Sequence, residues 1–145
     1  MLAEDIKNGS FKSSYLLYGE EAYLRTQYKN RLKNALADPS DTMNFSRFEG
    51  KGINPAEIIS LAETLPFFAE RRLILIEDSG FFKNKCDELA DYLPNMPDTT
   101  CLLFVETEVD KRNRLYKAVQ KYGRVTEFQL QDERTLMKWI LGTLK

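Results

Sequence analysis

The turn that follows the first apolar run of the sequence has the spacing of a phosphate-binding loop. Gly19 and Thr26 fall on the frame G-x-x-x-x-G-K-[ST], but Leu24 stands at its second Gly and Arg25 at its Lys. A phosphate cradle needs converging backbone N–H groups, and the side chain of Leu24 denies that approach. Two glutamates at 20–21 also occupy the helix start where an anion would bind. We interpret this segment as an ordinary strand-to-helix turn, a degenerate phosphate loop at Gly19, Leu24, Arg25 and Thr26.

A second apolar run, residues 73–76, ends in the acidic pair Glu77-Asp78. Such a pair holds magnesium and polarises water in P-loop ATPases. Apolar strands that end in an acid are common, so this pattern gains meaning only beside the degenerate loop. Together they indicate descent from an ATPase fold without its activity, and we expect both acids to be surface groups or turn caps.

Two adjacent aromatic residues, Phe67 and Phe68, follow Pro66. Neighbouring side chains diverge on a helix and alternate on a strand, so both rings do not easily face one core. One interpretation is that a rigid turn presents them as interface anchors, and the other is that both fill the core. For the pair 81–82, also two phenylalanines, we expect core or loop packing.

A run of cations without acids extends from residue 111 to residue 124 and forms a possible basic patch. It could follow a nucleic-acid backbone, although a solvated helix face or contact with an acidic protein is the plainer interpretation. The residues of this candidate patch are Lys111, Arg112, Arg114, Lys117 and Lys121.

The overall composition excludes several classes of protein. The 21 Lys and Arg nearly balance the 22 Asp and Glu, which excludes a uniformly basic nucleic-acid-coating protein. There is no histidine, so histidine-based triads and metal sites are excluded, and we expect neither metal nor cofactor. Cys86 and Cys101 match no disulfide or zinc spacing. With no signal peptide or membrane span in the pattern, we expect a cytoplasmic domain with reduced thiols.

Alternating strands and helices must position these residues. Short apolar or alternating runs predict strands at 15–18, 45–49, 73–76, 101–105 and 124–128. Helical spacing predicts helices over 20–37, from the Asn54 cap to Leu65, over 84–93, from an Asp110 cap to Gly123 at C′, and from an Asp132 cap onward. This order predicts an α/β fold, a mainly parallel five-stranded sheet with helices on both faces.

The sequence resembles the N-terminal domain of bacterial DNA polymerase III delta subunits. The resemblance lies in 15–21 (YLLYGEE), 44–48 (NFSRF), 65–76 (LPFFAERRLILI) and 110–117, with the Trp139-Ile140 helix behind them. It implies a P-loop NTPase (AAA+)-like fold without a working nucleotide site. It also implies a cytoplasmic clamp-loader subunit of the DNA polymerase III holoenzyme in DNA replication, with no intrinsic activity inside a DNA-directed DNA polymerase complex.

The resemblance further implies partners and boundaries. The family's hydrophobic wedge falls on Leu65, Phe67 and Phe68, and would bind the sliding clamp (beta subunit) and help open it for loading onto primed DNA. Delta prime and tau/gamma would be contacted mainly through further domains, DNA only indirectly, and membranes not at all. We expect a clamp-binding domain I at 1–131 and the start of a helical lid domain II at 132–145, so that the chain is a fragment.

Two other functions remain open at this point. A P-loop-like nucleotide-binding regulator predicts ATP affinity that depends on Arg25 and Thr26. A DNA-binding module predicts duplex binding with a steep salt dependence, through the cations of 111–124.

Overall fold

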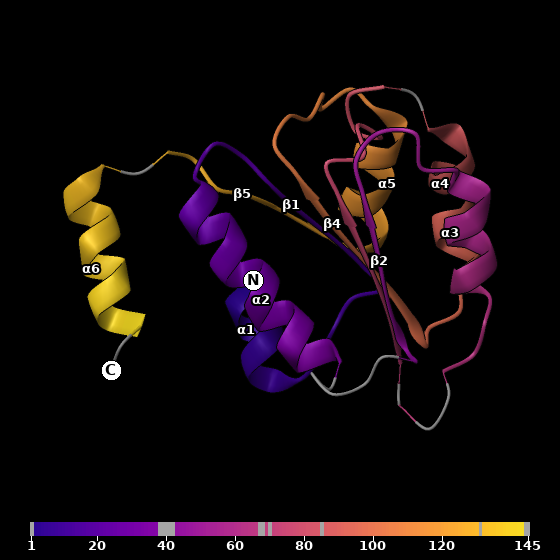
Figure 1. Ribbon diagram of the computed structural model, residues 1–145, viewed down its shortest axis with the longest axis horizontal. Helices are drawn as coiled ribbons and strands as arrows, with labels where there is room; N and C mark the ends of the chain where they lie inside the picture. The colour runs from indigo at the N-terminus through magenta and orange to yellow at the C-terminus, as the bar shows by residue number, and fades with distance from the viewer. Residues whose placement is uncertain are drawn as a thin grey trace.

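The computed structural model describes residues 2–37, 43–66, 69, 71–84, 86–130 and 132–143, without the side chains at 3, 142 and 143. A five-stranded sheet forms the middle layer, and helices cover both of its faces (Figure 1). The strands are β1 (Ser14–Tyr18), β2 (Phe45–Glu49), β3 (Arg72–Glu77), β4 (Thr100–Glu106) and β5 (Arg124–Glu127). All five predicted strands are therefore confirmed, with ends that shift by one residue at most.

The sheet has the order β2-β3-β4-β1-β5, and every neighbouring pair is parallel. The three inner strands are buried at every residue, as expected for strands covered on both faces. Their side chains alternate between the two faces: Leu16 and Tyr18 join one core, while Tyr15 and Leu17 join the other.

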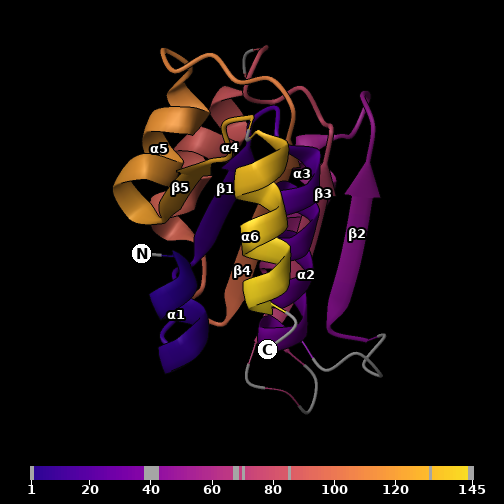
Figure 2. The same cartoon turned by 90° about the vertical axis from the view of Figure 1, so that its left-hand side faces the viewer.

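Helices lie on both faces of the sheet (Figures 1 and 2). The first core packs under α3 (Pro55–Ala62), α4 (Asp87–Tyr92) and α5 (Arg114–Tyr122). The second packs under α1 (Leu2–Asn8), α2 (Ala22–Leu36) and α6 (Glu133–Thr143). The α/β class with helices on both faces is thus confirmed. The helix α1 has no counterpart in the sequence-based prediction.

The helix α6 packs against the second core through Leu136 and Trp139. The Trp139 ring lies edge-on to Tyr23 at 5.6 Å between centroids, and 6.0 Å from the ring of Tyr28. The cap predicted for α6 is confirmed, because the Asp132 carboxylate accepts the amide of Thr135 at 2.6 Å.

Two helices are shorter than their apolar patterns predicted. The helix α3 ends at Ala62, so Leu65, which the pattern placed on its buried face, lies beyond it. The predicted Asn54 cap of α3 is present, and its side-chain oxygen accepts the amide of Ala56. The helix α4 begins at Asp87 and is followed by the 3₁₀ turn η1 (Leu93–Asn95), which contains Pro94.

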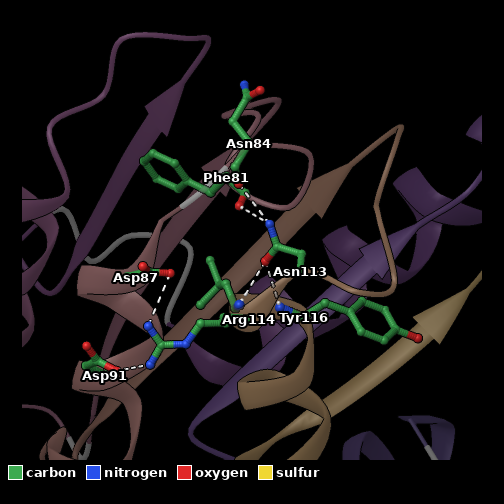
Figure 3. Close-up of polar contacts among 8 residues, drawn as sticks. Phe81, Asn84, Asp87, Asp91, Asn113, Arg114 and Tyr116 are labelled. Atoms are coloured by element: carbon green, nitrogen blue, oxygen red, sulfur yellow. Dashed lines mark hydrogen bonds and ion pairs between the residues drawn. The ribbon is translucent and has the colours of Figure 1, made fainter.

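The cap of α5 was predicted at the wrong residue. Asn113, not Asp110, accepts the first free amides of the helix, those of Leu115 at 2.8 Å and Tyr116 at 3.1 Å (Figure 3). Its amide nitrogen donates to the carbonyls of Phe81 and Asn84, which the sequence does not indicate. Asn113 therefore joins the helix start to the loop after β3.

The helix α5 ends before Gly123, as the sequence predicts, but this glycine does not have the left-handed conformation common at a helix end. Gly123 has a φ of −139°, which any residue can adopt. A Cβ at this position would come within 2.1 Å of the Ser14 carbonyl oxygen. Glycine is needed here because α5 turns into β5 directly against the start of β1.

Candidate functional site

The carboxyl ends of β1 and β4 mark the position where a ligand would bind in an open parallel sheet. The chain leaves β1 toward α2 on one face and leaves β4 toward α5 on the other, so the two connections diverge between these neighbouring strands. The degenerate phosphate loop lies at this end of the sheet, as its sequence position predicted.

The turn at Gly19 is closed by the backbone that follows β5. Phe128 donates its amide to the Tyr18 carbonyl at 2.7 Å, and the Phe128 carbonyl accepts the amide of Glu21 at 3.1 Å. Gly19 has a φ of +123°, and a Cβ here would lie 2.3 Å from the Phe128 carbonyl oxygen. Close backbone packing, not a phosphate, accounts for this glycine.

The remaining residues of the predicted loop have structural surroundings. Glu21 is buried, and its carboxylate accepts the amide of Tyr23 at 3.1 Å, so it caps α2. Leu24 is buried in the second core. The Arg25 guanidinium donates to the Gly19 carbonyl, and Thr26 is exposed. The Glu21 amide and the Arg25 guanidinium, which would face a phosphate, thus bond to the protein itself.

A cavity of about 430 Å³ lies beside this turn, lined by residues from the ends of β1, β4 and β5. Three glutamates, Glu20, Glu108 and Glu127, contribute to its lining. Lys83 pairs with Glu108 at 2.6 Å, and Lys111 lies 3.7 Å from Glu127, both on exposed side chains. The carboxylates make this cavity a poor environment for a polyphosphate.

The acidic pair after β3 separates into two different environments. Glu77 is buried, and its carboxylate contacts Arg47 at 2.9 Å and Lys29 at 3.5 Å. The expectation of a surface group is therefore wrong for Glu77, because β2 and α2 bring two cations to it. Asp78 is exposed in a turn and has a φ of +52°, as expected for a turn residue.

A further buried carboxylate, which the sequence analysis did not single out, lies at the end of β4. Glu106 accepts the Ser79 amide and hydroxyl, both at 3.1 Å, and the Gly80 amide at 3.0 Å. Burial raises the pKa of Glu106, and the hydrogen bonds from Ser79 and Gly80 offset part of that rise. An acid directly after an apolar run was the available signal, but its bonding partners are 26 and 27 residues away.

The second candidate site lies at the opposite, amino-terminal end of the sheet, about 17–20 Å away along strands of this length. Leu65 is 69% exposed in the segment after α3. Phe67 and Phe68, which complete the predicted wedge, lie outside the described residues. Phe81 and Phe82 are both buried, which confirms the expectation of core packing for that pair.

Arg72, the first residue of β3, holds the backbone around Leu65. Its side chain is buried, and Nε donates to the Thr64 carbonyl at 3.0 Å while Nη2 donates to the Leu65 carbonyl at 3.4 Å. The Thr100 hydroxyl donates to the Ala62 carbonyl at 2.7 Å. The carbonyl of Ala62, which ends α3, and the carbonyls of Thr64 and Leu65 are thus bonded to side chains of β3 and β4.

The predicted basic patch is interrupted by carboxylates. Arg114 contacts Asp87 at 3.3 Å and also Asp91, as Figure 3 shows. Arg112 pairs with Asp110 at 3.1 Å, and Lys111 faces Glu127. Lys117 is exposed on α5, and the Lys121 ammonium lies 5.1 Å from the centroid of the Tyr122 ring. The surface around α5 therefore carries both signs of charge.

Among the helices that the structure describes, none is both long and apolar enough to cross a bilayer. The described residues include no cluster of three acids or thiols arranged to hold a metal ion. Cys86 and Cys101 are buried free thiols, and burial raises the pKa of both.

Comparison with solved structures places the fold among clamp loaders and related AAA+ proteins. The DNA clamp loader delta protein of Bacillus subtilis superposes with a TM-score of 0.82 at 23% identity, over 95% of this chain and 44% of that one. A DNA polymerase III gamma subunit-related protein of Thermotoga maritima gives 0.62 at 11% identity, over 93% and 47% of the two chains. RuvB of the same organism gives 0.51 at 15%, over 94% and 44%. The class is an AAA+-like α/β domain.

The sequence comparisons identify the family within this class. Residues 15–129 match the model of the family "DNA polymerase III, delta subunit", and the chain belongs to that family. DNA polymerase III subunit delta of Bacillus subtilis is 29% identical over 136 residues, 86% of this chain and 39% of that protein. The chain thus spans about two fifths of the length of that relative.

Proposed function

We propose that this chain is the clamp-binding part of a clamp-loader delta subunit that acts in DNA replication. It binds the ring-shaped sliding clamp through Leu65, Phe67 and Phe68 and favours ring opening for loading onto primed DNA. Other clamp-loader subunits are contacted through segments beyond this chain, with 1–131 as domain I and 132–145 as the start of the lid. The family membership supplies the context for this proposal.

One observation carries the proposal, namely a large apolar side chain held in solvent by a rigid support. Leu65 is 69% exposed, yet its carbonyl is bonded to a buried arginine of the central sheet. An apolar anchor that is already ordered loses little conformational entropy on binding, as interface anchors require. It also lies at the end of the sheet away from the Gly19 turn, so clamp contact and the former nucleotide position are separate.

Ring opening follows from differential affinity. A partner shifts the clamp toward an open state only as far as it binds that state more tightly than the closed ring. Burial of one leucine or phenylalanine side chain contributes about 1.5–3 kcal/mol, so each wedge residue that is buried only against the open ring favours that state by about tenfold or more. The proposal needs no nucleotide chemistry within this chain, and at the Gly19 turn the Tyr18 carbonyl and the Glu21 amide already bond to the backbone of Phe128.

The proposal is tested by surface binding of the 145-residue chain to the purified sliding clamp encoded in the same genome. We expect saturable binding by the unaltered chain, and losses of about tenfold for Leu65→Ala and more for the pair Phe67→Ala and Phe68→Ala. The matched control is Leu130→Ala, since Leu130 is 68% exposed at the other end of the sheet. Equal binding by all of these variants, each folded by circular dichroism, contradicts the assignment.

A further inference from the structure

A second exposed apolar residue lies next to the segment that carries Leu65. Met43 precedes β2 and is 62% exposed, although it is separated from Leu65 by 22 positions in the sequence. It belongs to neither the family wedge nor any predicted element. Its place at the amino end of β2 puts it at the same end of the sheet, since β2 and β3 are parallel neighbours.

The guanidinium of Arg72 joins these two segments directly. Nη1 donates to the Met43 carbonyl at 3.2 Å, while Nη2 donates to the Leu65 carbonyl at 3.4 Å. Together with the bond from Nε to Thr64, one planar group fixes three main-chain carbonyls from two separate loops. Only arginine presents donors in such a fork, because a lysine ammonium is a compact point charge on a flexible stem.

The burial of this cation is informative. Arg72 is 6% exposed, and three carbonyl oxygens accept hydrogen bonds from its guanidinium. A buried charge is costly unless it is well hydrogen-bonded. An apolar residue at the start of a buried strand would serve the core without that cost, so the arginine is better explained by the loops that it orders.

We propose that Arg72 is a positioning residue that assembles Met43 and Leu65 into one apolar contact surface for the sliding clamp. This inference rests on the proposed clamp binding and adds to it a second contact segment, Met43, and the group that sets its place. Met43 supplies a flexible, polarisable side chain suited to an adaptable contact. Arg72 touches no partner itself and acts through the two loops.

The first test is Met43→Ala in the clamp-binding assay with the 145-residue chain. We expect affinity to fall about three- to tenfold with an unchanged thermal midpoint, because the side chain is exposed in the free protein. The matched control is Met137→Ala, since Met137 is 51% exposed on α6, and it should bind like the unaltered chain. Wild-type affinity for Met43→Ala overturns this inference. If Leu65→Ala loses binding in the same assay, the proposed function still stands.

The second test is Arg72→Lys, which keeps the charge and removes the fork. We expect clamp affinity to fall about tenfold or more although Met43 and Leu65 are both present. The control is Asn113→Ala, which should lower stability at the α5 cap and leave Arg72 in place. Its folded fraction should keep the clamp affinity of the unaltered chain, so a loss seen only with Arg72→Lys reflects positioning and not lower stability. Equal affinities for Arg72→Lys and Asn113→Ala at matched folded fractions overturn the positioning role. Absence of clamp binding by the unaltered chain contradicts both this inference and the proposed function.

Discussion

Gly19 and Phe128 lie in direct backbone contact, with the Phe128 carbonyl oxygen 2.3 Å from the point that a Cβ on Gly19 would occupy. The same carbonyl accepts the amide of Glu21 at the start of α2. The glycine that looks like the first residue of a phosphate loop is therefore required by the connection after β5. Gly19 matches the phosphate-loop pattern, but the close approach of the Phe128 backbone is what requires a glycine here.

Replacement of Gly19 by alanine should strongly destabilise the fold. We expect Gly19→Ala to lower the free energy of unfolding by about 2–4 kcal/mol, because both its positive φ and the contact with Phe128 exclude a side chain. Gly52→Ala is the control: its φ is also positive, at +88°, but nothing lies within 4 Å. It should cost about 1 kcal/mol in urea denaturation. Equal costs would show that the Phe128 contact contributes nothing.

The Gly19 turn should not bind ATP. Calorimetric titration of the chain with millimolar ATP and magnesium should give only heats of dilution, since the Glu21 amide and carboxylate are already bonded and three glutamates line the adjacent cavity. Arg25→Lys, which restores the lysine of the loop frame, should bind no better. A binding isotherm that disappears with Thr26→Ala would contradict this and revive the nucleotide-binding alternative.

The cap of α5 should carry a large share of local stability. Asn113→Ala removes two bonds to helix amides and two to the loop carbonyls of Phe81 and Asn84. We expect a loss of about 2 kcal/mol or more in thermal or urea unfolding. Asp110→Ala, at the residue that the sequence pattern favoured, should cost much less, since its carboxylate bonds to Arg112 and that pair lies on the surface. The reverse ranking would contradict the structure.

Stability should fall with rising pH through the titration of Glu106. Burial raises the pKa of this carboxyl above its ordinary value of 4.5, so in the window above 4.5 the folded state holds the proton more tightly than the unfolded state. The contribution of Glu106 is fully present below pH 4.5 and is lost as pH rises through the raised pKa. Urea unfolding between pH 4 and 8 should show this component in the parent protein and lack it in Glu106→Gln. Identical pH profiles would contradict the prediction.

Local sequence was sufficient for the strands and the class of fold. Runs such as 101–105 are apolar at every residue, and only a strand covered on both faces buries such a run completely. Helices between the runs then require parallel crossovers. The degenerate loop could be recognised for a similar reason, because the misfit of Leu24 to a phosphate cradle is a property of the residue itself.

The ends of the helices were decided by contacts that the sequence does not display. Asp110 and Asn113 are both good capping residues, and the choice of Asn113 depends on carbonyls of Phe81 and Asn84 about 30 residues earlier. Leu65 continues the apolar spacing of α3, yet the helix ends at Ala62, where Thr100 and Arg72 bond the carbonyls at and beyond its end. Periodicity reports which residues are apolar, not where a helix meets the next element.

Two polar clusters that the sequence pattern does not indicate come from pairings across the sheet. Glu106 meets Ser79 and Gly80 only because β3 and β4 are neighbours, and Arg72 meets Met43 only because β2 lies beside β3. By itself the sequence determined which segments bury themselves, since burial follows from composition and period along the chain. The tertiary structure alone decided which polar groups those segments bring together, because a hydrogen bond depends on distances that strand order sets.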